Sequence, residues 1–299
     1  MKYVSTRGHP SKVGFREAAL SGLAPDGGLY CPDVYPTLSP VPAGQDYLDT
    51  ATDILCAFAG KAISKSTMRG IVERAYEPFA HHSIAPLVQV GANRWMMELH
   101  HGPTLAFKDI AMRLIAQVYD HFLTESGERM TVLCATSGDT GGAAAAAFAN
   151  AKAIDVVILH PHDRISPVQR RFMTATGAPN IHNLALKGDF DGTQAILKSL
   201  MADLQFKQRT GLAAVNSINW TRVAAQSIYF AQAQAQLGSK GPITFVVPTG
   251  NFGDAFSGYV AHRAGLIPTY RCVSAVNEND AIVQALDNGR IAKRETAAT

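Results

Sequence analysis

Lys108 is the residue of this sequence with the clearest potential for covalent chemistry. It closes the segment HGPTLAFK, residues 101–108, which follows a predicted strand and opens a long predicted amphipathic helix. The peptide dipoles at a helix N-terminus disfavour an ammonium ion, and the neighbouring Phe107 adds desolvation. Both effects shift the amine toward the neutral form that attacks an aldehyde. An exposed lysine near a helix start would give the same pattern, so this segment alone leaves both interpretations open.

Two glycine loops lie between a predicted strand and a predicted helix. The first, TSGDTGG at residues 136–142, precedes an alanine-rich helix, and the second is PTGNFGD at residues 248–254. Glycines permit tight turns whose free amides point outward at the positive end of a helix, and these amides can bind an anion. Ordinary capping of the helix by Asp139 or Thr140 is the alternative for the first loop.

The three segments are more informative together than apart. A reactive lysine, a site of the size of a carboxylate and a phosphate site, each at the end of a strand, are what a pyridoxal-phosphate enzyme acting on an amino acid requires. The sequence therefore predicts pyridoxal 5'-phosphate as its cofactor.

These segments resemble those of the threonine synthase family, within the tryptophan-synthase-β-like, fold type II enzymes. HGPTLAFKD resembles the cofactor-lysine motif of that family, SGDTGG its substrate-carboxylate loop and PTGNFGD its cofactor-phosphate loop. DGGLY at residues 26–30 and NSINWTR at residues 216–222 agree as well. The matches follow the order of the family from near Met1 to about Val276.

The resemblance assigns a role to each motif residue. Lys108 would be the catalytic residue and would carry the cofactor as a Schiff base. The expected cofactor-binding residues are Lys108, Gly250, Asn251, Phe252, Gly253 and Asp254. The expected substrate-binding residues are Ser137, Asp139, Thr140, Asn216 and Arg222. Arg113 and Lys187 are weaker candidates for contacting a phosphate of the substrate.

The activity that the resemblance implies is that of a carbon–oxygen lyase. It would convert O-phospho-L-homoserine and water to L-threonine and phosphate, the last step of threonine biosynthesis. Family members are considerably longer, and their C-terminal part supplies a hydroxyl residue near the pyridine nitrogen, whereas this sequence stops at Thr299. We therefore expect weak or absent turnover from the isolated chain. The alternatives are a related lyase, such as a serine or threonine dehydratase or a phospholyase, and an inactive truncated binding module.

Predicted strands and helices, which must position these residues, alternate along most of the chain. Short apolar runs alternate with stretches of helical periodicity, which is typical of parallel α/β sheets covered on both faces. We expect an α/β fold with open, mostly parallel sheets, helices on both faces and a mainly helical N-terminal unit. The predicted strands are residues 95–99, 131–135, 154–160, 181–186, 243–247 and 270–276. The predicted helices are residues 16–23, 46–58, 67–75, 108–124, 142–152, 167–176, 193–208, 221–236, 255–264 and 280–287.

Three domains are expected from the change in pattern near residue 94 and from the family resemblance. They are an N-terminal domain of residues 1–93, a large cofactor-binding α/β domain of residues 94–129 and 211–299 whose C-terminal portion is missing, and a smaller α/β domain of residues 130–210. A ligand would bind where such units meet.

Composition and charge narrow the function class. The formal charge of the 299 residues is +3, with Lys and Arg scattered, so no basic surface for a nucleic acid is expected. No segment approaches the length of a membrane span, and the four cysteines show neither a disulfide nor a zinc spacing. His100 with His101, and His160 with His162, lack an acidic or cysteine partner at zinc spacing, so no metal site is expected. We expect a cytoplasmic enzyme, monomeric or homodimeric, that acts on a small molecule.

Overall fold

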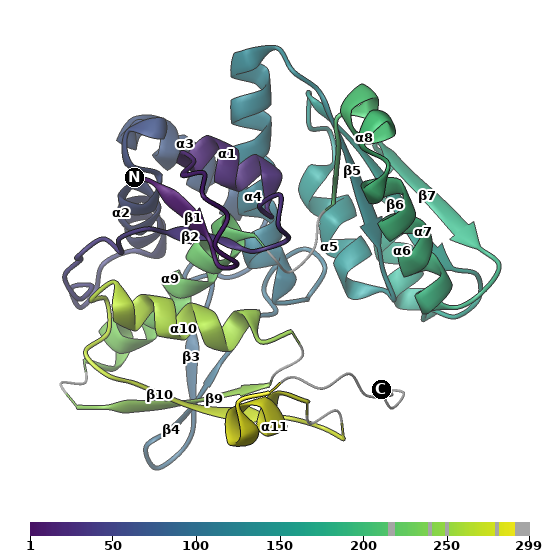
Figure 1. The fold of residues 1–299 in the computed structure, drawn as a ribbon. Helices are drawn as coiled ribbons and strands as arrows, with labels where there is room; N and C mark the ends of the chain where they lie inside the picture. The colour runs from purple at the N-terminus through teal and green to yellow at the C-terminus, as the bar shows by residue number, and fades with distance from the viewer. Residues whose placement is uncertain (215–218, 239–240, 249–250, 279–280, 291–299) are drawn as a thin grey trace.

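The computed structural model describes residues 1–214, 219–238, 241–248, 251–278 and 281–290 (Figure 1). Its N-terminal part combines helices with a two-stranded antiparallel sheet in which Tyr3 pairs with Pro32. The sequence predicted the helices and missed the strands, which are too short to show a periodic pattern. The elements are β1 (Tyr3–Ser5), α1 (Phe15–Ser21), β2 (Tyr30–Pro32), α2 (Tyr47–Ala59), the 3-10 helix η1 (Gly60–Ala62) and α3 (Lys65–Tyr76).

A four-stranded parallel sheet forms the second part, in the strand order β7-β6-β5-β8. Leu133 and Leu159 pack on the face of the sheet that carries α7 and α8, while Val132 and Val156 belong to the main core on the other face. The alternation explains why these strands are apolar throughout. The elements are β5 (Met130–Ala135), α5 (Asp139–Phe148), β6 (Ile154–Pro161), α6 (Pro167–Thr174), β7 (Ile181–Leu186), α7 (Phe190–Ala202), α8 (Leu204–Thr210) and β8 (Leu212–Ala214).

The third part contains a parallel strand pair and an antiparallel hairpin. Strands β9 and β10 pair in parallel, and Phe245 of β9 packs against Phe230 and Tyr270. Strands β3 and β4 form the hairpin, with Leu87 opposite Met97 (Figure 1). The elements are β3 (Leu87–Gly91), β4 (Arg94–Met97), β9 (Ile243–Pro248), α10 (Gly253–Arg263), β10 (Tyr270–Ala275) and α11 (Ala281–Asn288).

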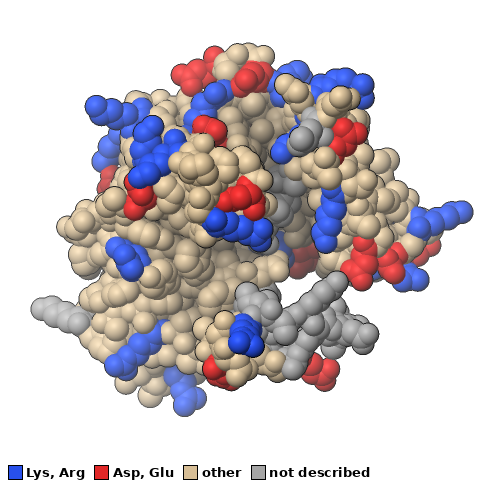
Figure 2. Space-filling model, in the orientation of Figure 1, with Lys and Arg blue, Asp and Glu red and all other residues tan. Residues whose placement is uncertain are grey.

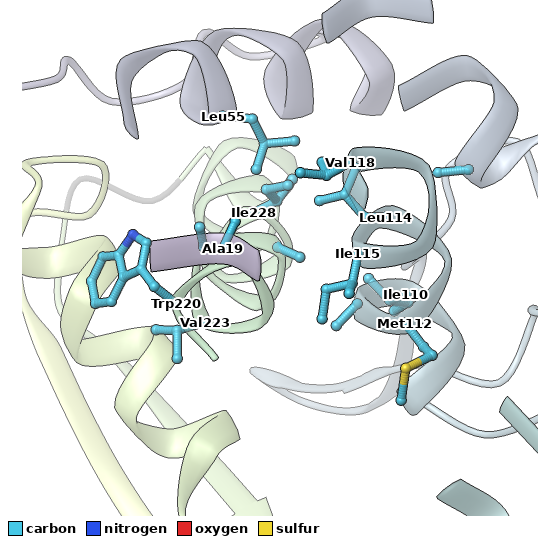
Figure 3. Close-up of a cluster of buried hydrophobic side chains, with 14 of the residues drawn as sticks. Ala19, Leu55, Ile110, Met112, Leu114, Ile115, Val118, Trp220, Val223 and Ile228 are labelled. Atoms are coloured by element: carbon cyan, nitrogen blue, oxygen red, sulfur yellow. The ribbon is translucent and has the colours of Figure 1, made fainter. Parts of the chain in front are cut away.

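Two long helices, α4 (Lys108–Ser126) and α9 (Trp220–Leu237), form the centre of the core. Figure 3 shows Leu114 and Val118 of α4 facing Ile228 of α9, with Leu55 of α2 beside them. All four side chains are at most 2% exposed. Because α4 begins at Lys108, this packing fixes the helix end that carries the candidate lysine.

The fold class expected from the sequence is confirmed. Strands β3 and β8 were not predicted, and two of the predicted elements differ from the structure. Residues 95–99 were predicted as a strand covered on both faces, but β4 pairs with β3 in a hairpin where Trp95 is 44% and Met96 57% exposed. The helix predicted at residues 193–208 is two helices, because Asp203 ends α7 and accepts a hydrogen bond from the Phe206 amide at the start of α8.

The division into three domains stays a prediction. Among the described residues, no helix combines the length and the apolar character needed to cross a membrane. On the face shown in Figure 2, Lys and Arg side chains lie among Asp and Glu rather than in one stripe.

Candidate active site

Lys108 is the first residue of α4, and its ammonium group faces the start of α5. The Nζ atom lies 3.6 Å from Oδ2 of Asp139 and 5.1 Å from the centre of the Phe107 ring. The Lys108 side chain is 22% exposed, whereas that of Asp139 is 53% exposed. The lysine is therefore a largely buried amine with one carboxylate at its accessible side, and not the exposed surface lysine of the alternative interpretation.

The surroundings of Lys108 lower the pKa of its amine. Burial is the largest cause, the positive charge of Arg222 acts in the same direction, and the carboxylate of Asp139 opposes both. Desolvation and a like charge both disfavour an ammonium ion. The result is an amine shifted toward its nucleophilic form, as the helix-start argument predicted.

Asp109 fixes the segment that leads to Lys108. Its carboxylate is fully buried and accepts hydrogen bonds from the Thr104 amide at 2.8 Å and the Thr104 hydroxyl at 2.7 Å. A side chain on Gly102 would meet the Asp109 side chain at 2.5 Å, so the segment can pass over this carboxylate only with glycine there. The motif HGPTLAFKD thus contains a loop that the bonds from Thr104 to Asp109 hold in place, as well as the candidate lysine.

The loop before α5 is organised by the buried hydroxyl of Thr136. This oxygen accepts the amide hydrogens of Gly138 at 2.9 Å and Gly141 at 3.0 Å. Gly138 has a φ of 146° and is the N-cap of α5, where no side chain caps the helix. The exposed Ser137 and the half-buried Thr140 therefore lie at a helix start where the N-cap residue offers no side chain and where Thr136 takes only the Gly141 amide of the first turn. The alternative interpretation of this loop, capping of α5 by Asp139 or Thr140, does not occur.

Gln169 of α6 holds Asp139 from the other side. Its side-chain amide donates to Asp139 Oδ1 at 2.9 Å, and its side-chain oxygen accepts from the Ser166 amide at 3.2 Å. Ser166 and Gln169 also form the capping box of α6. The sequence analysis did not find Gln169; the capping-box pattern would have placed it at a helix start, but not beside Asp139.

The loop before α10 presents a second uncapped helix start. Phe252 is the N-cap with a φ of 61°, and it makes no side-chain capping bond. The amides of Gly253 and Asp254 begin the helix and are of the kind that binds phosphate. Asn251 directly precedes this helix start, and Gly250 lies outside the described residues.

The carboxylate of Asp254 points toward α9, where the Tyr229 hydroxyl donates a hydrogen bond to it. Burial raises the pKa of Asp254, and both the Tyr229 bond and the charge of Arg222 act against that rise. Tyr229 was also missed from the sequence, because nothing local links it to a residue 25 positions away.

Arg222 lies in the first turn of α9 and is only 5% exposed. The helix start is anchored by Asn219, whose amide donates to the Ala19 carbonyl and the Tyr119 hydroxyl at 2.8 and 2.9 Å. Burial lowers the pKa of the guanidinium. Its positive charge lowers the pKa of both Lys108 and Asp254. The three predicted site residues are therefore close enough to interact electrostatically. Asn216, the other predicted residue of this motif, lies outside the described residues.

The two weaker candidate cations do not join this group. The guanidinium of Arg113 donates to the carbonyls of Ala75 at 2.7 Å and Ala146 at 3.1 Å, so it ties α3 to α5. Lys187 is exposed at the end of β7. The structure gives Arg113 a structural role that spacing in the sequence could not show.

His100 and His101 have the acidic neighbour that their spacing in the sequence did not suggest. In the described part of the chain, Glu98 is the third member of a group whose possible ligand atoms lie within 4.8 Å of one another. Glu98 is, however, already bonded to Nε2 of His101 at 2.8 Å. The lack of an acidic partner was the reason to expect no metal site at these histidines. That reason was wrong, because Glu98 lies beside both of them.

Comparison with known proteins identifies the family. Residues 82–299 match the family described as pyridoxal-phosphate dependent enzyme, and residues 2–76 match the N terminus of threonine synthase. A threonine synthase from Serratia marcescens is 37% identical over 305 residues, which cover all of this chain and 69% of that relative. The chain belongs to the threonine synthase family. The family resemblance seen in the motifs is thereby confirmed.

Other threonine synthases agree in sequence and in structure. A threonine synthase from Pseudomonas aeruginosa is 44% identical over 298 residues, 98% of this chain and 63% of that relative. The crystal structure of a pyridoxal-phosphate-bound threonine synthase from Brucella melitensis superimposes with a TM-score of 0.96 at 45% identity, covering 100% of this chain and 65% of that one. The fold type II architecture is thus confirmed, and the chain spans just under two thirds of the length of these two relatives.

Proposed function

We propose that this chain carries out the threonine synthase reaction, in which O-phospho-L-homoserine and water give L-threonine and phosphate. The observation that carries this proposal is the environment of Lys108, a largely buried amine close to the carboxylate of Asp139 and with its pKa lowered by burial and by the charge of Arg222. Membership of the family and the expected cofactor, pyridoxal 5'-phosphate, support it.

The residues present fit the cofactor. The Lys108 amine, with its lowered pKa, would attach to the aldehyde carbon. The uncapped start of α10, with the amides of Phe252, Gly253 and Asp254, would receive the cofactor phosphate. Asn251 and Gly250 complete the proposed phosphate loop. When bound, the cofactor would supply an electron-withdrawing ring that stabilises negative charge on the substrate carbon next to the amino group.

The residues of the α5 loop fit the substrate's carboxylate. The backbone amides of Asp139 and Thr140 and the hydroxyls of Ser137 and Thr140 are donors on one loop, whereas the Gly141 amide already donates to Thr136. Asp139 is held away from that role by Gln169 and faces the Lys108 ammonium, so it would orient the amine rather than the anion. We propose that Arg222, in the first turn of α9, and Asn216, from the same sequence motif, also bind the substrate.

Lys108 would also transfer protons during the reaction. With the substrate bound, the free Lys108 Nζ would accept the proton from Cα, since a neutral amine is a base. A second proton would leave Cβ as phosphate departs from Cγ. Water would then add its hydroxyl to Cβ and give its proton to the released phosphate, while the two protons removed earlier would return to Cα and to Cγ, which becomes the methyl group. The lowered pKa favours the first of these steps because it keeps Nζ unprotonated.

The identity of the product tests the proposal. The chain, supplied with pyridoxal phosphate and O-phosphohomoserine, is incubated to low conversion and its products are identified by chromatography and ³¹P NMR. We expect threonine and phosphate in equal amounts, at a low rate, and none from the Lys108→Ala variant. A keto acid and ammonia as the main products would overturn the proposal in favour of a dehydratase or phospholyase, and no Lys108-dependent product would favour a binding module.

We further propose that the protein acts in the cytoplasm, in keeping with a biosynthetic family, and as a monomer or homodimer. Fractionation of the source cells and sedimentation of the purified protein would test these two statements separately.

A further inference from the structure

Helix α9 carries a stripe of buried polar side chains. Arg222, Gln226 and Tyr229 follow one another at intervals of four and three residues, which places them on one face of the helix. They are 5%, 2% and 2% exposed. Buried polar groups are costly unless they have partners, so this face requires an explanation beyond core packing.

The Tyr229 hydroxyl links this stripe to α10. It donates a hydrogen bond to Oδ1 of Asp254 and accepts one from the side-chain amide of Gln226 at 3.2 Å. The hydroxyl therefore acts as a donor and as an acceptor at once, and its donated bond holds the Asp254 carboxylate toward Tyr229. Asp254 lies in the first turn of α10, directly after the proposed phosphate loop.

Arg222 is in a different situation. Its guanidinium is almost fully buried, yet in the described residues no carboxylate oxygen lies within 4.0 Å of it. Asp254 is near enough for the two charges to affect each other's pKa without forming this ion pair. A buried cation without a close counter-ion is unfavourable, and an incoming anion would relieve that cost.

We propose that the Tyr229 hydroxyl is a positioning group that holds the Asp254 carboxylate away from Arg222, so that the guanidinium stays available to an anionic group of the substrate. The inference rests on the proposed function for the identity of the anion, a phosphate ester. Without the hydroxyl, Asp254 would turn to Arg222 and close the site with an internal ion pair.

The test is a set of three variants: Tyr229→Phe, Asp254→Asn and both together. Inorganic phosphate is titrated by calorimetry into the protein loaded with pyridoxal phosphate. We expect Tyr229→Phe to weaken phosphate binding by on the order of tenfold, because an internal carboxylate now competes for the guanidinium. Adding Asp254→Asn to that variant should restore most of the affinity, since a neutral amide is a poor competitor.

Two comparisons separate positioning from simpler effects. Asp254→Asn removes a negative charge in any background, so its effect must be larger with Phe at position 229 than with Tyr, which a double-mutant cycle measures. Tyr259→Phe removes the same atom from a half-exposed tyrosine of α10 whose hydroxyl accepts from Arg263 at 3.1 Å, and it should leave phosphate binding unchanged.

Equal effects of Asp254→Asn in the two backgrounds, or unchanged phosphate affinity in Tyr229→Phe, would overturn the inference. So would a wild-type protein that does not bind phosphate at all. The titration is repeated on protein without the cofactor, so that a failure to load pyridoxal phosphate on Lys108 contradicts the proposed function and leaves the role of Tyr229 testable by itself.

Discussion

The Nζ atom of Lys108 lies 3.6 Å from the carboxylate of Asp139, and this pair joins the first turns of α4 and α5. The two helices come from segments that the sequence placed in different domains. Gln169 of a third helix holds the same carboxylate at 2.9 Å. The electrostatic state of the lysine therefore depends on groups from several separate elements.

Removing the Asp139 charge should lower the pKa of Lys108 further. The carboxylate favours the ammonium form, so Asp139→Asn removes a charge that raises the pKa of Lys108, while burial and the charge of Arg222 still lower it. The pH at which Lys108 becomes reactive toward an amine reagent, followed by mass spectrometry, should shift downward. Because Asp139 is half exposed, the shift should shrink at high salt. An upward shift would contradict this reading of the site.

Arg222→Gln should move the same pKa in the opposite direction. The guanidinium disfavours the Lys108 ammonium, and its removal allows more protonation at neutral pH. The reactive fraction of Lys108 at pH 7 should fall relative to wild type. Arg129→Gln is the control, because Arg129 is exposed and paired with Asp155 at 2.9 Å. Equal pH profiles for the two variants would show that Arg222 does not act on the lysine.

Gly138→Ala should disturb the α5 loop through Gln169. A Cβ at Gly138 would collide with the Gln169 side chain, and the φ of 146° adds backbone strain. We expect a loss of about 1–3 kcal/mol in the free energy of unfolding, and weaker binding of the substrate's carboxylate.

Gly188→Ala provides the matched control for that variant. Gly188 has almost the same φ, of 145°, but nothing lies within 4 Å of its added Cβ. Comparing the free energies of unfolding of the two variants in urea separates the cost of backbone strain from the cost of the collision with Gln169. The same loss of stability in both would remove the case for the Gln169 contact.

Asp109→Ala should destabilise the protein more than Asp109→Asn. Alanine leaves the buried amide and hydroxyl of Thr104 without their acceptor, which costs about 1–3 kcal/mol, whereas asparagine keeps an oxygen in place. Urea unfolding at pH 7 measures the order of the two variants. The reverse order would show that the Thr104 bonds contribute little.

The pH dependence of the Asp109→Asn comparison has a definite sign. Burial raises the pKa of Asp109 in the folded protein above its ordinary value of 3.8, so ionisation opposes folding. The wild type should lose stability relative to the asparagine variant as the pH rises from 3.8 through the raised folded pKa. Below pH 3.8 the Asp109 carboxyl is protonated in both the folded and the unfolded protein, so it gives no further pH dependence there. A relative gain of wild-type stability with rising pH would contradict the assignment.

Sequence patterns predicted those helices and strands whose ends are marked by nearby residues. The start of α4 at Lys108 follows from a glycine–proline turn and a long apolar period, and the structure places it at that residue. The β3–β4 hairpin could not be distinguished from a buried strand, since an apolar run such as the one around Trp95 does not reveal what covers it. The break at Asp203 depends on one capping bond within a continuous helical period.

The site was predictable in its motifs and not in its internal contacts. Lys108, Asp139 and Arg222 were proposed as site residues from three separate segments, and in the structure Asp139 and Arg222 both act on the charge of Lys108. The bonds from Gln169 to Asp139 and from Tyr229 to Asp254 join residues 30 and 25 positions apart on different helices. Such pairs are set by how helices pack, and helix packing has no local signature in the sequence.

The most direct test of the central claim is to locate the covalent link to the cofactor. The folded protein is supplied with pyridoxal phosphate, reduced with borohydride, digested and mapped by mass spectrometry. We predict one pyridoxyl group, on the peptide that contains Lys108, and its absence from the Lys108→Ala variant. A protein shown to be folded that carries no such group on Lys108, or carries it on another lysine, would contradict the account.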